Sequence, residues 1–316
     1  MEFVHVPVML SECVEALNLK EGGIYVDATI GGAGHSSEIL KRTKTAKLIG
    51  IDQDKDAIAF CTEKLKPYKD RCTLVHDNFS NLPSILEKLK IDEVDGILID
   101  LGVSSYQLDT PLRGFSFRFD APLDMRMNQE NPFSAYDVVN NYTQAQLKQI
   151  ISNFGEERFA SNIARQIVKA RSKEPIKTTQ DLKKVILAAV PKYRGKDGMD
   201  NVQRTFQAIR IEVNGELSII HQTVMSAISH LKVGGRLAIL TFHSLEDRIV
   251  KNTFKDLSTN CLCPPEFPVC VCGGNNAVIK VLTPKPVVAT KEEIKENSRS
   301  ASAKLRVAEK IKQNWV

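Results

Sequence analysis

A glycine-rich turn that directly follows a short apolar run constrains the fold of this chain more than any other feature. Ile24-Tyr25-Val26 is typical of a short buried strand, and the next turn contains Gly31, Gly32 and Gly34. A helical pattern begins at Ser36. Glycine permits close approach of the backbone to a ligand because it has no Cβ. Strand, glycine turn and helix in this order predict a nucleotide at the end of a parallel sheet.

The spacing around this turn indicates which nucleotide is bound. A dinucleotide fingerprint reads G-x-G-x-x-G, but Gly32-Ala33-Gly34 is followed by His35-Ser36-Ser37, so the third glycine is absent. Asp27 precedes the turn, where a carboxylate suits an ammonium or sulfonium better than a pyrophosphate. Asp52 ends the next apolar run, about 20 residues after the turn, where a ribose-hydroxyl acceptor is expected. These residues favour S-adenosylmethionine over NAD, and an ordinary βα turn is the alternative.

Further apolar runs are typical of strands in the same sheet, and polar residues follow several of them. The runs are 47–52, 73–77, 94–100 and 236–242. Ligands lie at the carboxyl ends of such strands, so we expect Phe79 to stack on an adenine ring unless it is a core residue. Asp100 ends the 94–100 run, and Ser104 and Gln107 follow it, so we predict the reaction centre there rather than a plain loop. His243 either contacts the substrate or is structural.

The alternation of strand and helix stops over residues 110–210, which instead show helical patterns. This segment begins with Arg113, Phe115, Phe117 and Arg118. Interleaved arginine and aromatic residues suit phosphate pairing and stacking on RNA bases. One face of a buried strand would explain the phenylalanines equally well. We therefore hold these four residues as candidates for contact with an RNA substrate.

The second half of this segment is basic. Over residues 148–210, fourteen Lys and Arg residues stand against six Asp and Glu residues, a local excess of +8 that fits phosphate binding. A solvated helix face is the alternative. We predict an α/β domain formed by residues 1–109 and 211–316, with residues 110–210 as an inserted helical domain that recognises RNA.

The part after the insert allows more local predictions. We expect one long helix over 211–231, and a helix capped by Ser244 with Asp247 at its third position. The segment 277–283 is typical of a further strand. The basic residues 297–306 are interpreted as a segment that runs into a helix and could lie along a phosphate backbone.

Composition points to the cytoplasm. The 316 residues include seven cysteines, an odd number, and three of them lie alone in helix or strand patterns, which argues for a reducing compartment. No apolar run approaches the roughly 18 residues of a membrane span. Residues 1–5 lack the charged start and apolar core of a signal peptide. We therefore predict a cytoplasmic protein that binds no membrane.

Four cysteines form two closely spaced C-x-C pairs, Cys261 with Cys263 and Cys270 with Cys272. Such a set could bind zinc. However, C-x-C is not the usual C-x2-C knuckle, and the rest of the expected fold needs no metal. The sequence therefore predicts no bound metal, and we interpret the four residues as redox-sensitive surface thiols.

Four motifs stand in a fixed order along the chain. They are Val26–Ser36, Asp100–Ser105, Arg113–Phe117 and Phe242–Arg248. Together they resemble one family, the bacterial 16S ribosomal RNA cytosine-N4 methyltransferases known as MraW or RsmH, and the resemblance continues through residues 297–301 and 305–306. It implies a class I, Rossmann-like methyltransferase sheet with an inserted helical domain, and a decoding-centre cytidine of 16S rRNA as substrate. The cofactor residues that it carries over are Ala33, Gly34, His35, Asp52, Phe79, Asp100 and Gln107.

The chemistry of such a transfer needs an acceptor near the cytosine amine, because the N4 lone pair is delocalised into the ring. We expect the loop from Asp100 to Ser105 to supply it, with Asp100 and Ser104 as catalytic candidates and His243 as a further one. Many amino-methyltransferases carry Asp/Asn-Pro-Pro-Tyr/Phe here, whereas this loop reads Asp100-Leu101-Gly102-Val103. Phe115, Phe117 or His243 could then stack on the base. The alternative is a non-catalytic RNA-binding or ribosome-assembly factor, and an NAD enzyme is disfavoured by the missing glycine.

Overall fold

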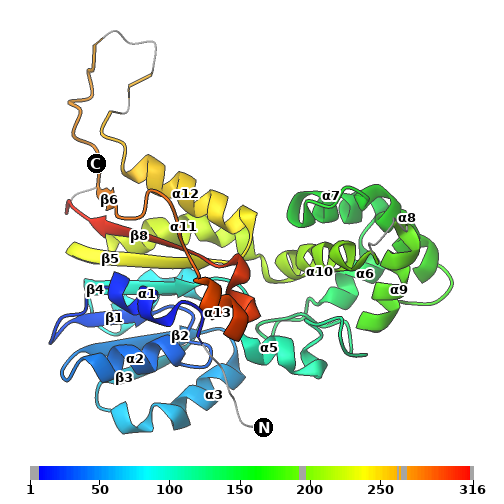
Figure 1. Ribbon diagram of the computed structural model, residues 1–316, viewed down its shortest axis with the longest axis horizontal. Coiled ribbons are helices and arrows are strands. Elements are labelled where there is room, and N and C mark those ends of the chain that lie inside the picture. The colour runs from blue at the N-terminus through cyan, green and yellow to red at the C-terminus, as the bar shows by residue number, and fades with distance from the viewer. Residues whose placement is uncertain (1–6, 192–196, 262, 265–268, 314–316) are drawn as a thin grey trace. The chain divides into compact units, whose positions relative to one another are not determined.

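The computed structural model describes residues 7–191, 197–261, 263–264 and 269–313. It divides into two compact units, residues 1–102 with 217–316, and residues 103–216 (Figure 1). The boundaries lie within seven residues of the expected ones at 109/110 and 210/211. Independent folding of either part stays a prediction, because the division describes contacts alone.

The first unit contains an eight-stranded sheet in the order β3-β2-β1-β4-β5-β8-β6, with β7 also paired to β8. Five strands run parallel: β1 Ile24–Asp27, β2 Lys47–Asp52, β3 Cys72–His76, β4 Val94–Asp100 and β5 Leu231–Thr241. Strand β8 Lys304–Lys310 is antiparallel to β5, β6 Ile279–Val281 and β7 Val287–Val288. The predicted strands are confirmed, and so is the Rossmann-like α/β class of this unit.

Helices cover both faces of the sheet, and each face has its own apolar cluster. One cluster joins Tyr25 and Leu48 to α1 Leu10–Ala16, α2 Gly34–Arg42 and α3 Lys55–Lys64. The other joins Ile97 and Ile239 to α4 Leu82–Lys88, α11 Glu216–Ser229 and α12 Ser244–Leu257. The remaining short helices are η1 Lys66–Tyr68, η2 Phe79–Asn81, α13 Lys291–Glu296 and η4 Ser298–Ser302. No helix among the described residues is both long and apolar enough for a membrane span.

The second unit is helical and has a separate core. Its helices are α5 Ser105–Asp109, η3 Pro111–Arg113, α6 Ala135–Asn141, α7 Gln144–Gly155, α8 Ala160–Arg171, α9 Thr179–Ala189 and α10 Met199–Asn214. Apolar residues at helical spacing, such as Leu147, Ile151, Ile163 and Ile167, are fully buried in one cluster. The helical character expected for the inserted segment is confirmed.

The predicted long helix over 211–231 is wrong. Helix α10 ends at Asn214, and α11 begins at Glu216, because Gly215 takes a left-handed conformation with φ 60° and ψ 27°. Its N–H donates to the carbonyls of Ile211 and Glu212, a glycine-terminated helix end. The apolar periodicity continues across this break, which is why the sequence pattern conceals it.

Two further local predictions are wrong. The cap of α12 is His243 rather than Ser244, and Glu246 rather than Asp247 is the third residue of the helix. The basic tail runs into strand β8 rather than a helix. Its charges are compensated inside the unit, since Arg306 donates to Asp247 at 2.6 Å and Lys310 to the carbonyl of Leu231 at 2.6 Å.

We expect Gly50→Ala to destabilise the protein, because the new Cβ would lie 2.3 Å from Ile30 Cδ1 and 3.0 Å from Leu74 Cδ2. Overpacking of this kind costs about 1–3 kcal/mol of unfolding free energy. Denaturant unfolding monitored by circular dichroism measures the loss. Ile30→Val removes the Cδ1 atom, so the double variant should regain part of the stability. Equal stability of Gly50→Ala and the parent protein would contradict the packing described here.

Candidate functional site

Three aspartates lie at the carboxyl edge of the parallel strands. Asp27 ends β1, Asp52 ends β2 and Asp100 ends β4. The strand order reverses at β1, which pairs with β2 on one side and β4 on the other. Ligands of open α/β sheets bind at such a switch point. The predicted ligand edge is therefore formed by the carboxyl ends of β1, β2 and β4, the strands that the sequence indicated.

Asp27 is buried and held by the turn that follows it. Its Oδ2 accepts a 2.6 Å hydrogen bond from Ser36 Oγ, and its Oδ1 accepts a 3.3 Å bond from the Thr29 amide. Burial raises the pKa of Asp27 to about 6, although both hydrogen bonds oppose this shift. The carboxyl is thus positioned by the first turn of α2 as well as by its own strand.

Asp52 connects the glycine turn to β2. Its Oδ2 accepts from the Gly31 amide at 2.8 Å, and its Oδ1 accepts from the Asp54 amide at 2.9 Å. Burial raises the pKa of Asp52 to about 6, and Asp54 and Asp27 contribute through their charges. Each carboxyl oxygen has a second lone pair, so the group can still accept a ligand hydroxyl.

Asp100 is the most strongly perturbed of the three. Burial, followed by the charges of Asp27 and Glu246, raises its pKa to about 8. Its amide donates to Thr29 Oγ1 at 2.6 Å, which ties the end of β4 to the loop after β1. Among the described residues, no donor reaches the Asp100 carboxyl oxygens. A cation bound at this edge would therefore ionise Asp100 and provide its missing partner.

The glycine turn contains two residues with left-handed backbone conformation. Gly31 has φ 48° and Ala33 has φ 55°, both left-handed. A Cβ on Gly34, the first residue of α2, would lie 2.1 Å from Pro7 Cγ. The carbonyl of Gly32 accepts from Lys64 Nζ at 2.5 Å, which fixes the turn against α3. Contacts with Asp52, Lys64 and Pro7 thus restrain the turn. Gly31, Gly32, Ala33 and Gly34 stay predicted cofactor residues.

His35 and Phe79 are both engaged with protein in the structure. The His35 ring Nε2 lies 3.0 Å from the carbonyl oxygen of Val8, and burial lowers the pKa of His35 to about 4. A neutral imidazole at this position supports the turn. Phe79 is half-buried and packs against the apolar cluster below the sheet. Contact of either residue with a cofactor stays a prediction.

His243 acts as the cap of α12. Its Nδ1 accepts from the Glu246 amide at 3.4 Å, and Glu246 Oε2 accepts from the amides of Phe242 and His243 at 2.7 and 3.2 Å. This reciprocal arrangement fixes the imidazole at the end of β5. The structure gives His243 a structural role, and its catalytic role stays a prediction.

Ser104 and Gln107 belong to the second unit, where they cap α5. The Ser104 Oγ accepts from the Gln107 amide at 3.2 Å, and the Gln107 side-chain oxygen accepts from the Ser104 amide at 3.1 Å. Gln107 is buried. The polar atoms expected to face a ligand are used in this capping box. The catalytic role of Ser104 and the cofactor role of Gln107 stay predictions.

The four candidate substrate residues divide into two buried and two more accessible side chains. Arg113 is 2% exposed and donates to the carbonyls of Arg126 and Met127 at 2.9 Å each, and Phe115 is 7% exposed in the same core. Phe117 packs edge-on against Phe206, and Arg118 is exposed. Burial assigns Arg113 and Phe115 a structural role, so Phe117 and Arg118 are the better candidates for RNA contact.

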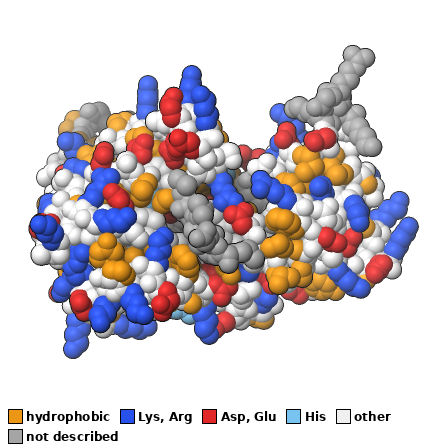
Figure 2. All heavy atoms as spheres, turned by 60° about the horizontal axis from the view of Figure 1, so that its bottom comes forward, with side chains coloured by type: hydrophobic (Ala, Val, Ile, Leu, Met, Phe, Trp, Pro, Cys, Tyr) orange, Lys and Arg blue, Asp and Glu red, His pale blue; other side chains and the backbone are white. Residues whose placement is uncertain are grey.

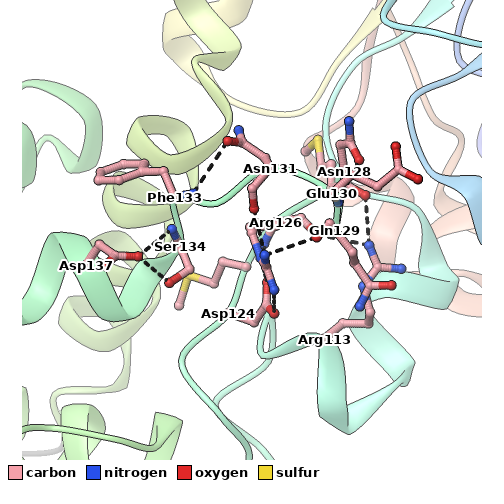
Figure 3. A network of polar contacts seen from close by, with 12 residues as sticks. Arg113, Asp124, Arg126, Asn128, Gln129, Glu130, Asn131, Phe133, Ser134 and Asp137 are labelled. Carbon is pink, nitrogen blue, oxygen red and sulfur yellow. Dashed lines mark hydrogen bonds and ion pairs between the residues drawn. The ribbon is translucent and has the colours of Figure 1, made fainter.

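Arg126 shows how this unit uses arginines internally. It donates to both carboxyl oxygens of Asp124, at 2.8 and 2.7 Å, and to the carbonyls of Gln129 and Asn131 (Figure 3). A guanidinium with its planar set of donors can close a loop in this way. Arg113 and Arg126 therefore order the loop before α6, which the sequence pattern alone did not indicate.

Fewer basic side chains of residues 148–210 are exposed and unpaired with acidic groups or backbone carbonyls than the count of Lys and Arg in the sequence suggests. Arg171 donates to the carbonyls of Val139 and Tyr142, Arg204 pairs with Glu157, and Arg210 pairs with Glu216. Lys192, Arg194 and Lys196 lie outside the described residues. The exposed basic residues are Lys148, Arg158, Arg165, Lys169, Lys173, Lys177 and Lys184. Figure 2 shows Lys and Arg side chains interspersed with acidic and apolar ones on the face it presents.

Sequence reasoning passed over three residues that shape the carboxylate edge. Thr29 accepts from the Asp100 amide, Ser36 donates to Asp27, and Glu246 accepts from the amides after β5. Ser36 carried a usable signal, because a hydroxyl in the first turn of a helix can reach the residue that ends the preceding strand. Thr29 and Glu246 carried none, since their partners are distant in sequence or depend on the exact helix start.

Comparison with known proteins gives one consistent result. Residues 2–311 match the MraW methylase family. The chain is 55% identical over 312 residues to the ribosomal RNA small subunit methyltransferase H of Clostridium botulinum strain Loch Maree, covering 98% of this chain and all of the relative. The protein of the same name from C. botulinum strain 657 is also 55% identical over 312 residues, with the same coverage. An rRNA methylase structure from Streptococcus thermophilus is 12% identical, with a TM-score of 0.42, over 98% of this chain and all of that one.

We expect Asp100→Asn to stabilise the ligand-free protein in a pH-dependent manner. The folded pKa of about 8 lies above the ordinary value of 3.8, so ionisation of Asp100 opposes folding. The destabilisation is absent below the unfolded pKa, grows as the pH rises through the window between the two values, and is complete above about pH 8. Thermal unfolding should show little gain near pH 4 and the full gain near pH 8.5. Exposed Asp70→Asn is the matched control, and a gain independent of pH would refute the assignment.

Proposed function

Because the chain belongs to the MraW methylase family, we propose that it transfers a methyl group from S-adenosylmethionine to ribosomal RNA of the small subunit. The observation that carries this proposal is the carboxylate edge formed by Asp27, Asp52 and Asp100. Burial raises the pKa of each, so each is costly to ionise without a positive ligand. A ligand with a sulfonium, an ammonium and ribose hydroxyls fits this edge, whereas the pyrophosphate of NAD would add like charge.

The residues of the edge can be given separate tasks. Asp52 lies on β2 beside the glycine turn and is suited to accept from ribose hydroxyls, while Asp27 supports the turn from β1. S-adenosylmethionine supplies an activated methyl group when bound. Asp100, at the end of β4, would be ionised by a bound sulfonium, and its carboxylate can then accept a hydrogen bond from an attacking amine and take up its proton.

We propose the N4 amine of a cytidine in the decoding centre of 16S rRNA as the methyl acceptor. Support comes from the resemblance of four separate motifs to that family, and from relatives that carry the name ribosomal RNA small subunit methyltransferase H. The base has to be unpaired or extruded to reach an active site, at a cost of a few kcal/mol. Backbone contacts by exposed basic residues of the second unit would offset this cost.

Methyl transfer to small ribosomal subunits tests the proposal directly. Subunits from cells that lack the protein are incubated with tritiated methyl donor, and nucleoside mass spectrometry identifies the product. We expect N4-methylated cytidine at one position, and transfer should be lost in Asp100→Ala. Label in another nucleoside would overturn the cytidine target alone. Binding of the subunits without any transfer would instead favour an assembly factor.

We expect exposed basic residues of α8 to contribute to RNA binding. Arg165 and Lys169 are exposed one helical turn apart, so they can face the same phosphate backbone. Replacing both with glutamine should weaken binding to small-subunit RNA and reduce the slope of log affinity against log salt by roughly one per lost contact. Fluorescence anisotropy over a salt series measures both quantities. Lys41→Gln/Lys44→Gln, which replaces two exposed lysines of the first unit, is the charge-matched control, and an unchanged slope in the α8 double variant would exclude this surface.

A further inference from the structure

The segment between α12 and β6 gathers four cysteines that methyl transfer does not use. The sulfur atoms of Cys261, Cys263, Cys270 and Cys272 all lie within 4.8 Å of one another. No disulfide joins any of the seven cysteines, all of which the structure describes. Four thiols from two short stretches of chain thus converge on one point.

The sulfur–sulfur distances among Cys261, Cys270 and Cys272 are close to the edges of a tetrahedral metal centre, and Cys263 Sγ lies within 4.8 Å of the other three sulfur atoms. Cys270 Sγ lies 3.5 Å from both Cys261 Sγ and Cys272 Sγ, and Cys261 Sγ lies 3.8 Å from Cys272 Sγ. A tetrahedron with zinc–sulfur bonds of about 2.3 Å has sulfur–sulfur edges of about 3.8 Å. A disulfide would require about 2.05 Å. The spacing therefore leaves room for an ion at the centre and is too wide for a covalent pair.

The C-x-C spacing does not prevent chelation. The 3.5 Å separation of Cys270 Sγ and Cys272 Sγ shows that residues two apart can direct both sulfurs to one side. The shorter spacing was one of the two sequence arguments against zinc. The folded segment removes that objection.

Hydrogen bonds to sulfur provide a second, independent observation. The Val271 amide donates to Cys263 Sγ at 3.3 Å, and Asn276 Nδ2 donates to Cys272 Sγ at 3.3 Å. Donors of this kind stabilise thiolates and orient metal ligands. Asn276 also closes the base of the segment, since its amide and side chain both donate to the Asn260 carbonyl. Asn276 therefore connects the cysteine cluster to the hydrogen bonds that join residues 260 and 276.

The described apolar residues next to the second C-x-C pair do not bury their side chains. Val269 and Val271 are 70% and 74% exposed. A short stretch that cannot bury apolar side chains needs a covalent or metal crosslink to adopt one conformation. Four sulfur ligands in tetrahedral geometry select zinc or iron among common metals.

We propose that Cys261, Cys263, Cys270 and Cys272 bind one Zn²⁺ ion as a structural site. Four thiols release four protons and form four zinc–sulfur bonds, leaving a centre with a net charge of −2. No electron transfer is involved. Coordination withdraws the sulfurs from oxidation, so the proposal replaces the expectation of redox-sensitive surface thiols and of a metal-free protein.

Metal analysis of the full-length protein tests the proposal. Protein produced with zinc in the medium should contain about one zinc per chain by inductively coupled plasma mass spectrometry. The double variant Cys270→Ser/Cys272→Ser should lose this zinc. Val271→Ser is the matched control, because it keeps the backbone donor and all four thiols while changing an exposed side chain of the same segment. A control variant without zinc, or a double variant that retains it, would contradict the assignment.

Cobalt provides a readout that does not depend on how the variants fold. Wild-type protein stripped of metal is titrated with Co²⁺ under anaerobic conditions, and we expect intense thiolate-to-cobalt and visible d–d bands that saturate at one equivalent. Thiol titration of the denatured, metal-free, unreduced chain should count all seven cysteines. Absence of both zinc and the cobalt bands, a thiol count reduced by disulfides, or an iron–sulfur spectrum would each overturn the proposal.

Discussion

The burial of three carboxyl groups at one edge of a parallel sheet, with a smaller contribution from their like charges, is the constraint on which the rest of this molecule depends. Asp27, Asp52 and Asp100 end neighbouring strands, and the charge of Asp27 raises the pKa of the other two. Such an arrangement stores unfavourable electrostatic energy in the ligand-free fold. The surrounding sheet, with an apolar cluster on each face, supplies the stability that tolerates it. Binding of a positively charged ligand offsets this electrostatic cost.

The sheet was predictable because its signals are local. Acidic residues end β2 and β4, and the apolar runs that precede them have the short length of buried strands. Two failures have different causes, the first local but concealed by the apolar pattern and the second non-local. Gly215 breaks a helix within an uninterrupted apolar pattern, and β8 carries Arg306 and Lys310 into the interior. Their partners, Asp247 and the carbonyl of Leu231, lie 59 and 79 residues away in sequence, beyond any reading of periodicity.

The candidate site was predictable in part, for a similar reason. The glycine turn and the strand-end aspartates depend on backbone geometry that short motifs encode. Side-chain roles depend on what fills the surrounding space. Arg113 looks like a phosphate ligand in the sequence, yet it donates to backbone carbonyls of its own unit. Composition cannot distinguish an arginine that closes a loop from one that meets RNA, because both need the same planar donors.

The position of the insert between two paired strands has a kinetic consequence. Asp100 on β4 pairs with Leu240 on β5, so the chain must close a loop of 140 residues to complete the sheet. For a flexible chain the entropy of that closure is roughly 4 kcal/mol. A helical unit with short-range contacts folds faster than a sheet of distant strands. Early collapse of residues 103–216 around their own core would shorten the effective loop between β4 and β5. Folding of the second unit would then assist assembly of the sheet into which it is inserted.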